Sequence, residues 1–438
     1  MNLLRVKKSL RVFTDLKFAI VILMTIAIAS SLGSFIEQDE NLEFYQENYP
    51  LNKPIYGFIT WKTIILLGLD HVYINWWFLI LLLILGICLI SCTFTRQLPL
   101  FINSKDYFFK KNKSSFLKLP FSVQVKNLYY LKENVINKIQ NSNFYIFQYG
   151  NLVYGYRGLV GRISPILVHL SLIIILVGAS WGAFNNFKAQ EILPKGEVFH
   201  IQNPIKIGSL TMLPELNSRV NDFWVEYQDN RIKQFYTNLS ILNNKGLEVK
   251  NQTISVNNPL RYQNIDFYQS DWNLLGIRIK PELTSNKVLE VPLFPLKDKA
   301  KTWITWVEDT NGNSQTLIFD QLQNVFSVYN NRGVFIQTYN LGDKFDNTKQ
   351  VIEIISATGL QIKYDPSIPI IYTGFGLLMV TAFLSYLPYT QIWLYNKKNI
   401  CWLGSLTNRG KINLEIEFEN LVREIEKSLF KTAFRKNL

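Results

Sequence analysis

Residues 163–183 read ISPILVHLSLIIILVGASWGA, and this run decides the class of the fold. It contains no Asp, Glu, Lys or Arg. The hydrocarbon core of a bilayer is about 30 Å thick, and a helix of about 20 predominantly apolar residues crosses it. The run therefore predicts a membrane-spanning helix, which carries one ionisable side chain, that of His169.

Three further runs have the length and hydropathy of spans. They are residues 18–36 (FAIVILMTIAIASSLGSFI), 76–95 (WWFLILLLILGICLISCTFT) and 368–389, which ends just beyond Pro388. Residues 18–36 follow basic residues, as the apolar part of a signal peptide would. Their apolar run is too long for a signal peptide and more spans follow, so we expect it to stay in the protein. The sequence thus predicts an integral membrane protein with four transmembrane α-helices.

The placement of charge predicts the orientation of these spans. Segment 96–162 holds eleven Lys or Arg and two acidic residues, whereas the 37–75 loop is acidic at its start. Lys and Arg are enriched on the side of synthesis, which predicts that the N-terminal tail (1–17), segment 96–162 and residues 390–438 share that side. The 37–75 loop and residues 184–367 then face the other side. The net charge of +13 is accordingly a topology signal rather than a sign of nucleic-acid binding.

The regions between the spans differ in pattern. Residues 184–367 contain short alternating runs such as GVFIQTY (333–339), which predict a large, mainly-β domain on the far side. Segment 96–162 predicts a small α+β module. In residues 390–438 the stretch NLEIEFENLVREIEKSLF (413–430) has an apolar stripe, which predicts a C-terminal amphipathic helix that packs on the module or lies along the membrane surface.

The cysteines exclude one class of function. Cys88 and Cys92 lie within an apolar run, Cys401 lies near the C-terminus, and residues 184–367 contain none. No C-x-x-C motif occurs, so the chain is not expected to be a thiol–disulfide carrier. Cys88 and Cys92 are interpreted as small residues that pack between helices.

His169 is the candidate functional residue, because an ionisable group inside the membrane is costly and marks a functional site by default. Imidazole is a usual axial ligand of haem iron. The alternative is a neutral imidazole that bridges two helices by hydrogen bonds. At 1.5 Å per residue His169 lies about 9 Å below the synthesis-side surface, which leaves roughly 20 Å of the core to His71 and His200. If two histidines hold a haem at this level, the second must therefore come from another chain.

Arginines at the same membrane face are candidates for holding the carboxylates of a haem. Arg162, Arg157 and Arg96 lie there in the sequence, and guanidinium groups bind carboxylates through paired hydrogen bonds. Each is equally well explained as a topology determinant or an interfacial anchor. Among them Arg162, next to the span, is the candidate partner of a propionate.

Four stretches, taken in order, resemble the system II cytochrome c biogenesis proteins of the CcsB or ResB type. They are LKFAIVILMTIAIASSLGSFIEQ (16–38), LGLDHVYINWWF (67–78), GLVGRISPILVHLSLIIILVGASWG (158–182) and DPSIPIIYTGFGLLMVTAFLSYLPYTQIW (365–393). The third, with its histidine, is the most specific. The resemblance covers nearly the whole chain.

The resemblance implies a function in cytochrome c biogenesis. The family works with a multispan partner, CcsA, to deliver haem across the membrane and attach it to apocytochromes c, such as cytochrome f and soluble c-type proteins. By position, His169 corresponds to the family's transmembrane histidine, taken as an axial ligand of haem b in transit. Asp365 corresponds to an acidic residue at the head of the last span, where a helix N-cap is an equally good explanation.

The resemblance also implies what this chain lacks. The tryptophan-rich haem-handling motif and the paired external histidines are absent here, and the family places them on CcsA. The chain is thus expected to be an accessory subunit of a haem-lyase complex with no catalytic residues of its own. Composition suggests a plastid (chloroplast) thylakoid membrane, with a bacterial inner membrane as the alternative.

Other functions agree less well with the sequence. A resident b-type cytochrome needs histidine pairs on facing helices, and a transporter usually shows repeats and interrupted spans. A structural assembly factor, or a chaperone that binds apocytochrome without ligating haem, remains a second hypothesis.

Overall fold

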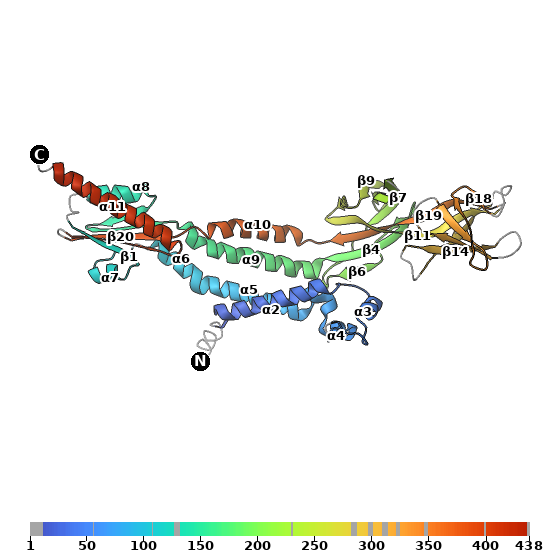
Figure 1. The fold of residues 1–438 in the computed structure, drawn as a ribbon, viewed down its shortest axis with the longest axis horizontal. Helices are drawn as coiled ribbons and strands as arrows, with labels where there is room; N and C mark the ends of the chain where they lie inside the picture. The colour runs from blue at the N-terminus through green and yellow to red at the C-terminus, as the bar shows by residue number, and fades with distance from the viewer. Residues whose placement is uncertain are drawn as a thin grey trace. The chain divides into compact units, whose positions relative to one another are not determined.

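The computed structural model describes residues 12–55, 57–106, 108–126, 132–228, 231–281, 287–296, 301–308, 314–320, 325–345, 349–397 and 400–435. Arg5, Lys7, Lys8 and Arg11 of the N-terminal tail lie outside these ranges. The chain folds into two compact units. The first comprises Met1–Gln38, Lys62–Ser180 and Ser367–Leu438, and the second comprises Asp39–Trp61 and Trp181–Pro366. Figure 1 labels helices and strands of both units.

Within the described ranges, three helices are long and apolar enough to cross a membrane. They are α2 (Leu16–Phe35), the helix Trp76–Lys105 and α9 (Val160–Asn185). A fourth apolar helix, α10 (Ile368–Leu384), is shorter. Its 17 residues end five positions before the predicted limit of the last span at residue 389.

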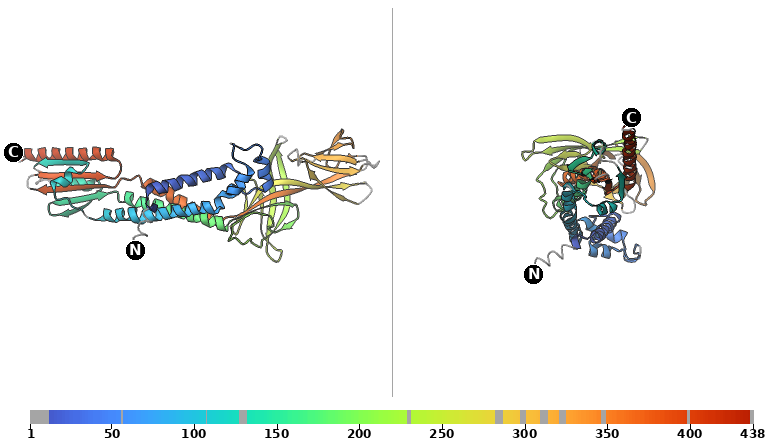
Figure 2. Two further views of the ribbon diagram at one scale, coloured as in Figure 1. Left: turned by 90° about the horizontal axis from the view of Figure 1, so that it is seen from below. Right: turned by 90° about the vertical axis from the view of Figure 1, so that its left-hand side faces the viewer.

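The helix Trp76–Lys105 has three parts. α5 (Trp76–Cys92) leads into a π-helical turn, η2 (Thr93–Gln97), which continues as α6 (Leu98–Lys105). Hydropathy predicted an end at residue 95, but backbone hydrogen bonding carries the helix on for ten residues. α2 runs beside α5 (Figure 1, Figure 2). Ala29, Phe78 and Leu82 are buried between them, and Leu176 of α9 packs against the same cluster.

Small residues allow α9 and α10 to approach closely. A Cβ on Gly374 would lie 2.6 Å from Ile175 Cγ1, and one on Gly178 would lie 2.8 Å from Ile371 Cγ1. Each glycine therefore accepts an isoleucine of the other helix. Small residues at a helix interface give this close packing in membrane proteins, where lipid provides no hydrophobic drive for association.

A small α+β domain completes the first unit. Its antiparallel sheet has the order β1-β21-β20-β3-β2. The strands are β1 (Phe121–Lys126), β2 (Tyr145–Tyr149), β3 (Leu152–Arg157), β20 (Thr390–Lys397) and β21 (Ile400–Thr407). The helices are α7 (Lys113–Leu117), α8 (Lys132–Asn141) and α11 (Lys411–Arg435).

The composition of this domain corrects the prediction for residues 390–438. That segment was expected to form an amphipathic helix, but its first part forms the hairpin β20–β21, and the helix begins only at Lys411. The hairpin lies between β1 and β3, so segment 96–162 alone supplies just three of the five strands. Ile392, Trp393 and Leu394 of β20 are all buried, and a short apolar run of this kind is typical of a buried strand.

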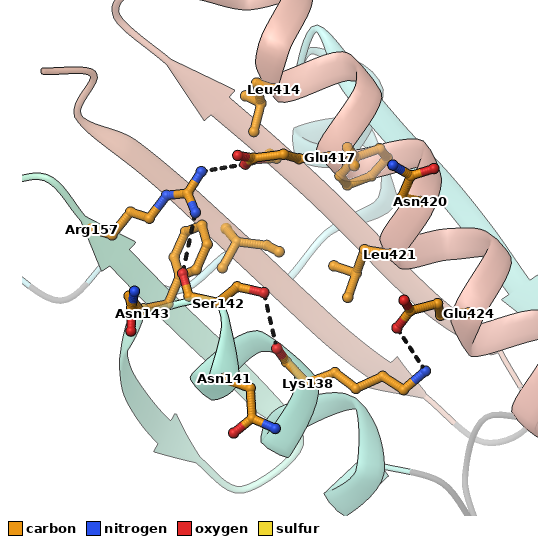
Figure 3. A pocket seen from close by; sticks show the side chains of 14 residues that line it. Lys138, Asn141, Ser142, Asn143, Arg157, Leu414, Glu417, Asn420, Leu421 and Glu424 are labelled. Carbon is orange, nitrogen blue, oxygen red and sulfur yellow. Dashed lines mark hydrogen bonds and ion pairs between the residues drawn. The ribbon is translucent and has the colours of Figure 1, made fainter.

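α11 packs on this sheet. Phe418 and Ile425 of α11 are buried in one core with Val135 and Ile139 of α8. Of the two places expected for the amphipathic helix, the structure has it on the module. Along its edge a cavity of about 470 Å³ is crossed by two ion pairs (Figure 3). These pairs are Arg157–Glu417 and Lys138–Glu424.

The second unit is mainly β, and its described residues form three antiparallel sheets. The largest has the order β10-β11-β19-β4-β6, with β12 on β11 and β18 on β19. Its strands are β4 (Phe187–Pro194), β6 (Pro204–Ile207), β10 (Leu260–Tyr262), β11 (Ile265–Lys280), β12 (Leu289–Pro292), β18 (Lys344–Phe345) and β19 (Lys349–Tyr364).

The other two sheets flank two separate cores. One sheet contains β5 (Val198–Phe199), β7 (Asn217–Gln228), β8 (Arg231–Leu242) and β9 (Glu248–Ser255). The other contains β13 (Phe294–Pro295), β14 (Trp303–Glu308), β15 (Ser314–Phe319), β16 (Val325–Tyr329) and β17 (Phe335–Asn340). The long strand β11 serves both cores, with Phe267 in one and Ile277 in the other. β-bulges along the β11–β19 pair shift the register between the two cores.

The 37–75 loop also contains helical structure. It forms the helices α3 (Leu42–Asn48) and α4 (Trp61–Leu67) and the 3₁₀ helix η1 (Leu69–Ile74). The Gln38 amide donates to Leu69 O at 2.8 Å, and its side-chain oxygen accepts from Val72 N at 3.0 Å. These bonds fasten the end of α2 to η1.

Candidate functional site

His169 lies in α9 and contacts the helix Trp76–Lys105 at its π-turn. Its Nδ1 is 2.9 Å from Thr93 Oγ1 and 3.2 Å from Leu89 O. Its Nε2 is 3.0 Å from the amide nitrogen of Gln97. The imidazole is half-buried and has a partner on each ring nitrogen.

These partners determine which nitrogen carries the proton. The Thr93 hydroxyl donates to Leu89 O at 2.8 Å, so its oxygen is left to accept. Nδ1 thus faces two acceptors, Thr93 Oγ1 and Leu89 O, and must be the donor. Nε2 then has a lone pair, which accepts from the Gln97 amide. A histidine that ligates a metal typically donates its other N–H to a carbonyl in this way, which orients the ring.

The π-turn places these partners on one face of the helix. Leu89, Thr93 and Gln97 are spaced four apart, the spacing of neighbours along a helix face. π-turns are rare and are often found at functional sites. Sequence analysis missed Thr93 and Gln97, because they straddle the predicted end of the span at residue 95. The sequence did contain a signal for them, because Thr93 and Gln97 are two polar residues spaced four apart at the end of an apolar run.

Arg162 shares a helix face with His169, since it lies seven residues earlier in α9. Two helical turns separate the two residues by about 10.5 Å along the axis. The Arg162 guanidinium carbon lies 4.9 Å from the centre of the Tyr389 ring. The Tyr389 hydroxyl donates to Ser104 O at 2.9 Å and is 3.3 Å from the Tyr154 hydroxyl. Arg162 is therefore held where α9, α6 and the small sheet meet.

Two buried polar atoms near this face have no hydrogen-bond partner among the described residues. They are Arg162 Nε and Gln97 Oε1. A buried polar group without a partner is uncommon and needs an explanation, such as a ligand or water. A haem with its iron at His169 Nε2 and a propionate at Arg162 suits this donor set, provided that the Gln97 amide moves aside.

The other candidate arginines are not gathered here. Arg157 pairs with Glu417 of α11 and lies 4.8 Å from the centre of the Phe144 ring. Arg96 is exposed on the π-turn.

Asp365 is not the N-cap of the last helix. Ser367 occupies that position, and Asp365 lies two residues before it. The N-cap explanation offered for Asp365 is therefore wrong.

The remaining histidines and the cysteines form no second centre. His71 Nδ1 is 2.9 Å from Asp70 Oδ1, and His200 Nε2 is 3.1 Å from the Gln202 amide. Within the described ranges, no group of three or more His, Cys, Asp or Glu residues is arranged to hold a metal ion. The three cysteines are free thiols, two of them buried.

The sequence comparisons with known proteins agree along nearly the whole chain. Residues 16–332 and 307–419 match the ResB-like family. The chain is 43% identical to cytochrome c biogenesis protein Ccs1 of Phaeodactylum tricornutum, over 94% of this chain and 99% of that protein. It is 39% identical to Ccs1 of Porphyra purpurea, over 93% and 94% of the two chains. It is 37% identical to cytochrome c biogenesis protein CcsB of Crocosphaera subtropica, over 96% and 95%.

Among solved structures, cytochrome c haem lyase CcmF aligns with 52% of this chain and 24% of its own, at 8% identity and a TM-score of 0.21. That likeness is too slight to support an argument. The sequence relatives suffice, since the match is high and nearly full length: the chain belongs to the ResB-like family.

Proposed function

We propose that this chain acts in cytochrome c biogenesis, where it presents His169 as an axial ligand to haem b that is passing through the membrane. Haem is the cargo of this process. The opposite axial ligand comes from a CcsA-type multispan partner, and the complex attaches the haem to apocytochromes c, including cytochrome f. The names of the relatives and the membrane-length helices support this proposal.

The observation that carries it is the geometry at His169. Nδ1 is anchored by Leu89 O, which leaves the Nε2 lone pair as the ligating atom. The Gln97 amide covers that lone pair at 3.0 Å and must leave when iron binds. Arg162, two turns away on the same face, is the proposed partner of a haem propionate.

The test is to replace His169 in the complex co-purified with its CcsA-type partner. We expect His169→Gln to lose haem and to stop formation of holocytochrome c, while His71→Gln and His200→Gln retain both. The measurements are the Soret absorption per mole of protein and haem staining of the cytochromes. Added imidazole should partly restore haem to His169→Ala, because it supplies the missing ligand. A His169→Gln complex with stoichiometric haem and an unchanged spectrum would contradict the proposal.

A second candidate function is that of a structural assembly factor or apocytochrome chaperone. It is favoured by the fact that both imidazole nitrogens already have partners inside the chain. In that case the imidazole only joins α9 to the π-turn. A Gln side chain can likewise donate to Leu89 O and accept from Gln97, so His169→Gln would then retain function.

The proposal includes four spans, with α10 as the fourth. It places the small α+β domain and both termini in the stroma, and the mainly-β unit in the lumen of the thylakoid. The apolar residues of α10 and the asymmetry of Lys and Arg between the loops support this topology. Protease added to sealed vesicles with the stromal face outward should remove α11 and spare the 184–367 region. Digestion of that region with α11 intact would reverse the orientation.

A further inference from the structure

One row of side chains crosses the largest sheet of the second unit. Lys206, Lys188, Lys363, Asp266 and Arg261 are directly opposite one another on five adjacent strands. The row contains four cations and one carboxylate. Like charges directly opposite each other in a sheet are destabilising, so this row works against the stability of the sheet that carries it.

Among the described residues, two of the cations form no ion pair. Lys206 pairs with Asp39 at 3.2 Å, and Arg261 pairs with Asp266 at 3.2 Å. Lys188 and Lys363 face each other across β4 and β19, and neither has a carboxylate within ion-pair distance in the part of the chain described. Partial burial and the Lys188 ammonium lower the pKa of Lys363, and Asp266 opposes this effect. The two ammonium groups thus repel each other, and Asp266, which already pairs with Arg261, offsets this repulsion only in part.

Chain connectivity keeps this row close to the membrane. Lys188 lies three residues after the last residue of α9, and Lys363 lies five residues before the first residue of α10. An extended chain covers at most about 3.6 Å per residue, so these lysines lie within about 11 Å and about 18 Å of the helix ends. The headgroup region adds about 5–8 Å on each side of the hydrocarbon core, and these limits keep both lysines within reach of it. On the far side of the membrane, Lys residues this close to two spans run against the usual distribution.

An apolar loop lies at the same end of the sheet. Leu210 is 67% and Met212 93% exposed. The loop is fixed to the end of α9, because Leu210 N donates to Phe184 O at 2.9 Å and the Thr211 hydroxyl donates to Asn186 O at 3.0 Å. A cavity of about 340 Å³ lies beneath it, lined by Phe187 and other residues. Phe187 points to the opposite face of the sheet from Lys188, since neighbouring side chains in a strand alternate.

We propose that this end of the mainly-β unit is seated on the membrane surface, where Lys188 and Lys363 bind the headgroup of an anionic lipid and Leu210 and Met212 enter the leaflet. The ligand is a phosphate or sulfonate group at the membrane surface. Its negative charge relieves the repulsion between the two lysines. Asp266 provides this compensation only in part, because it already pairs with Arg261.

The experiment uses the full chain, purified in detergent and titrated with phosphatidylglycerol or phosphatidylcholine, with retained lipid counted by native mass spectrometry. The double variant Lys188→Gln/Lys363→Gln removes the pair. We expect phosphatidylglycerol affinity to fall about fivefold for each lysine removed, with phosphatidylcholine unaffected. The matched control is Lys280→Gln/Lys344→Gln, because both lysines lie opposite Gln350 at the far end of β19.

Folding does not obscure the result, since removal of a like-charge pair should keep or raise the unfolding temperature of the chain. Leu210→Ser/Met212→Ser gives an independent variant, which should also weaken retention of phosphatidylglycerol. Two outcomes would overturn the proposal. One is an equal loss of phosphatidylglycerol in the control. The other is full displacement of the lipid by millimolar inorganic phosphate, which would assign the lysines to a free anion.

Discussion

The sharpest prediction concerns Gln97, whose amide covers the proposed ligand atom. The perturbation is Gln97→Ala, which removes the 3.0 Å contact to His169 Nε2 and leaves the Nδ1 contacts in place. Alanine is a good helix former, so the helix around the π-turn should persist. In the haem-free state of the variant, His169 Nε2 no longer accepts a hydrogen bond from residue 97.

The expected magnitude follows from one neutral hydrogen bond. Such a bond contributes about 0.5–1.5 kcal/mol net. Haem must break it to reach Nε2, so its removal in advance should tighten haem binding about 2- to 12-fold. The same free energy should appear as a loss of stability of the haem-free chain, because only that state contains the bond.

The assay is a Soret titration of the complex with its CcsA-type partner, together with thermal unfolding of the haem-free form. Gln38→Ala is the control, because Gln38 bonds Leu69 O and Val72 N at the other end of α5. That variant should lose stability with no change in haem affinity. If Gln97→Ala lowered the unfolding temperature and left haem affinity unchanged or weaker, Nε2 would not be the ligand and the structural function of His169 would be favoured.

Three further predictions test the packing and the chemistry. Gly374→Val should destabilise the α9–α10 pair by about 1–3 kcal/mol, measured by thermal unfolding in detergent, whereas Gly376→Val should have little effect because nothing lies within 4 Å of a Cβ there. Ile425→Ala should lower the free energy of unfolding by about 2–5 kcal/mol and expose α11 to limited proteolysis, because Ile425 is 1% exposed. The matched control is Ile416→Ala, since Ile416 is 55% exposed. Equal proteolysis of both variants would refute the packing of α11 on the sheet. Replacement of all three cysteines by Ser or Ala should leave cytochrome c maturation largely intact, with a loss of stability of about 1 kcal/mol per site. If the variant accumulated normally but could not mature cytochromes, a redox function of the cysteines would have to be reconsidered. The residues replaced are Cys88, Cys92 and Cys401.

Sequence alone located the apolar helices and singled out His169. Hydropathy is a local property, because a single run of about 20 apolar residues is long enough to cross the hydrocarbon core without help from the rest of the chain. The mainly-β nature of the 184–367 region was predictable for the same reason, since alternation is visible within each strand. Helix ends were less predictable: the helix that starts at Trp76 continues to Lys105, because a helix held together by its own backbone hydrogen bonds need not stop at the membrane surface.

Which segments contact one another is determined by the tertiary fold. Trp393 pairs with Tyr154 in the small sheet, although the whole mainly-β unit and two apolar helices separate them in the chain. The same holds at the candidate site, where Thr93 and Gln97 reach His169 from more than 70 residues away. Strand pairing and contacts between helices depend on partners that are distant in sequence, so a local pattern of apolar and polar residues does not predict them. His169 could therefore be identified from the sequence, whereas the choice of Nε2 as the proposed ligating atom depends on contacts that only the folded chain provides.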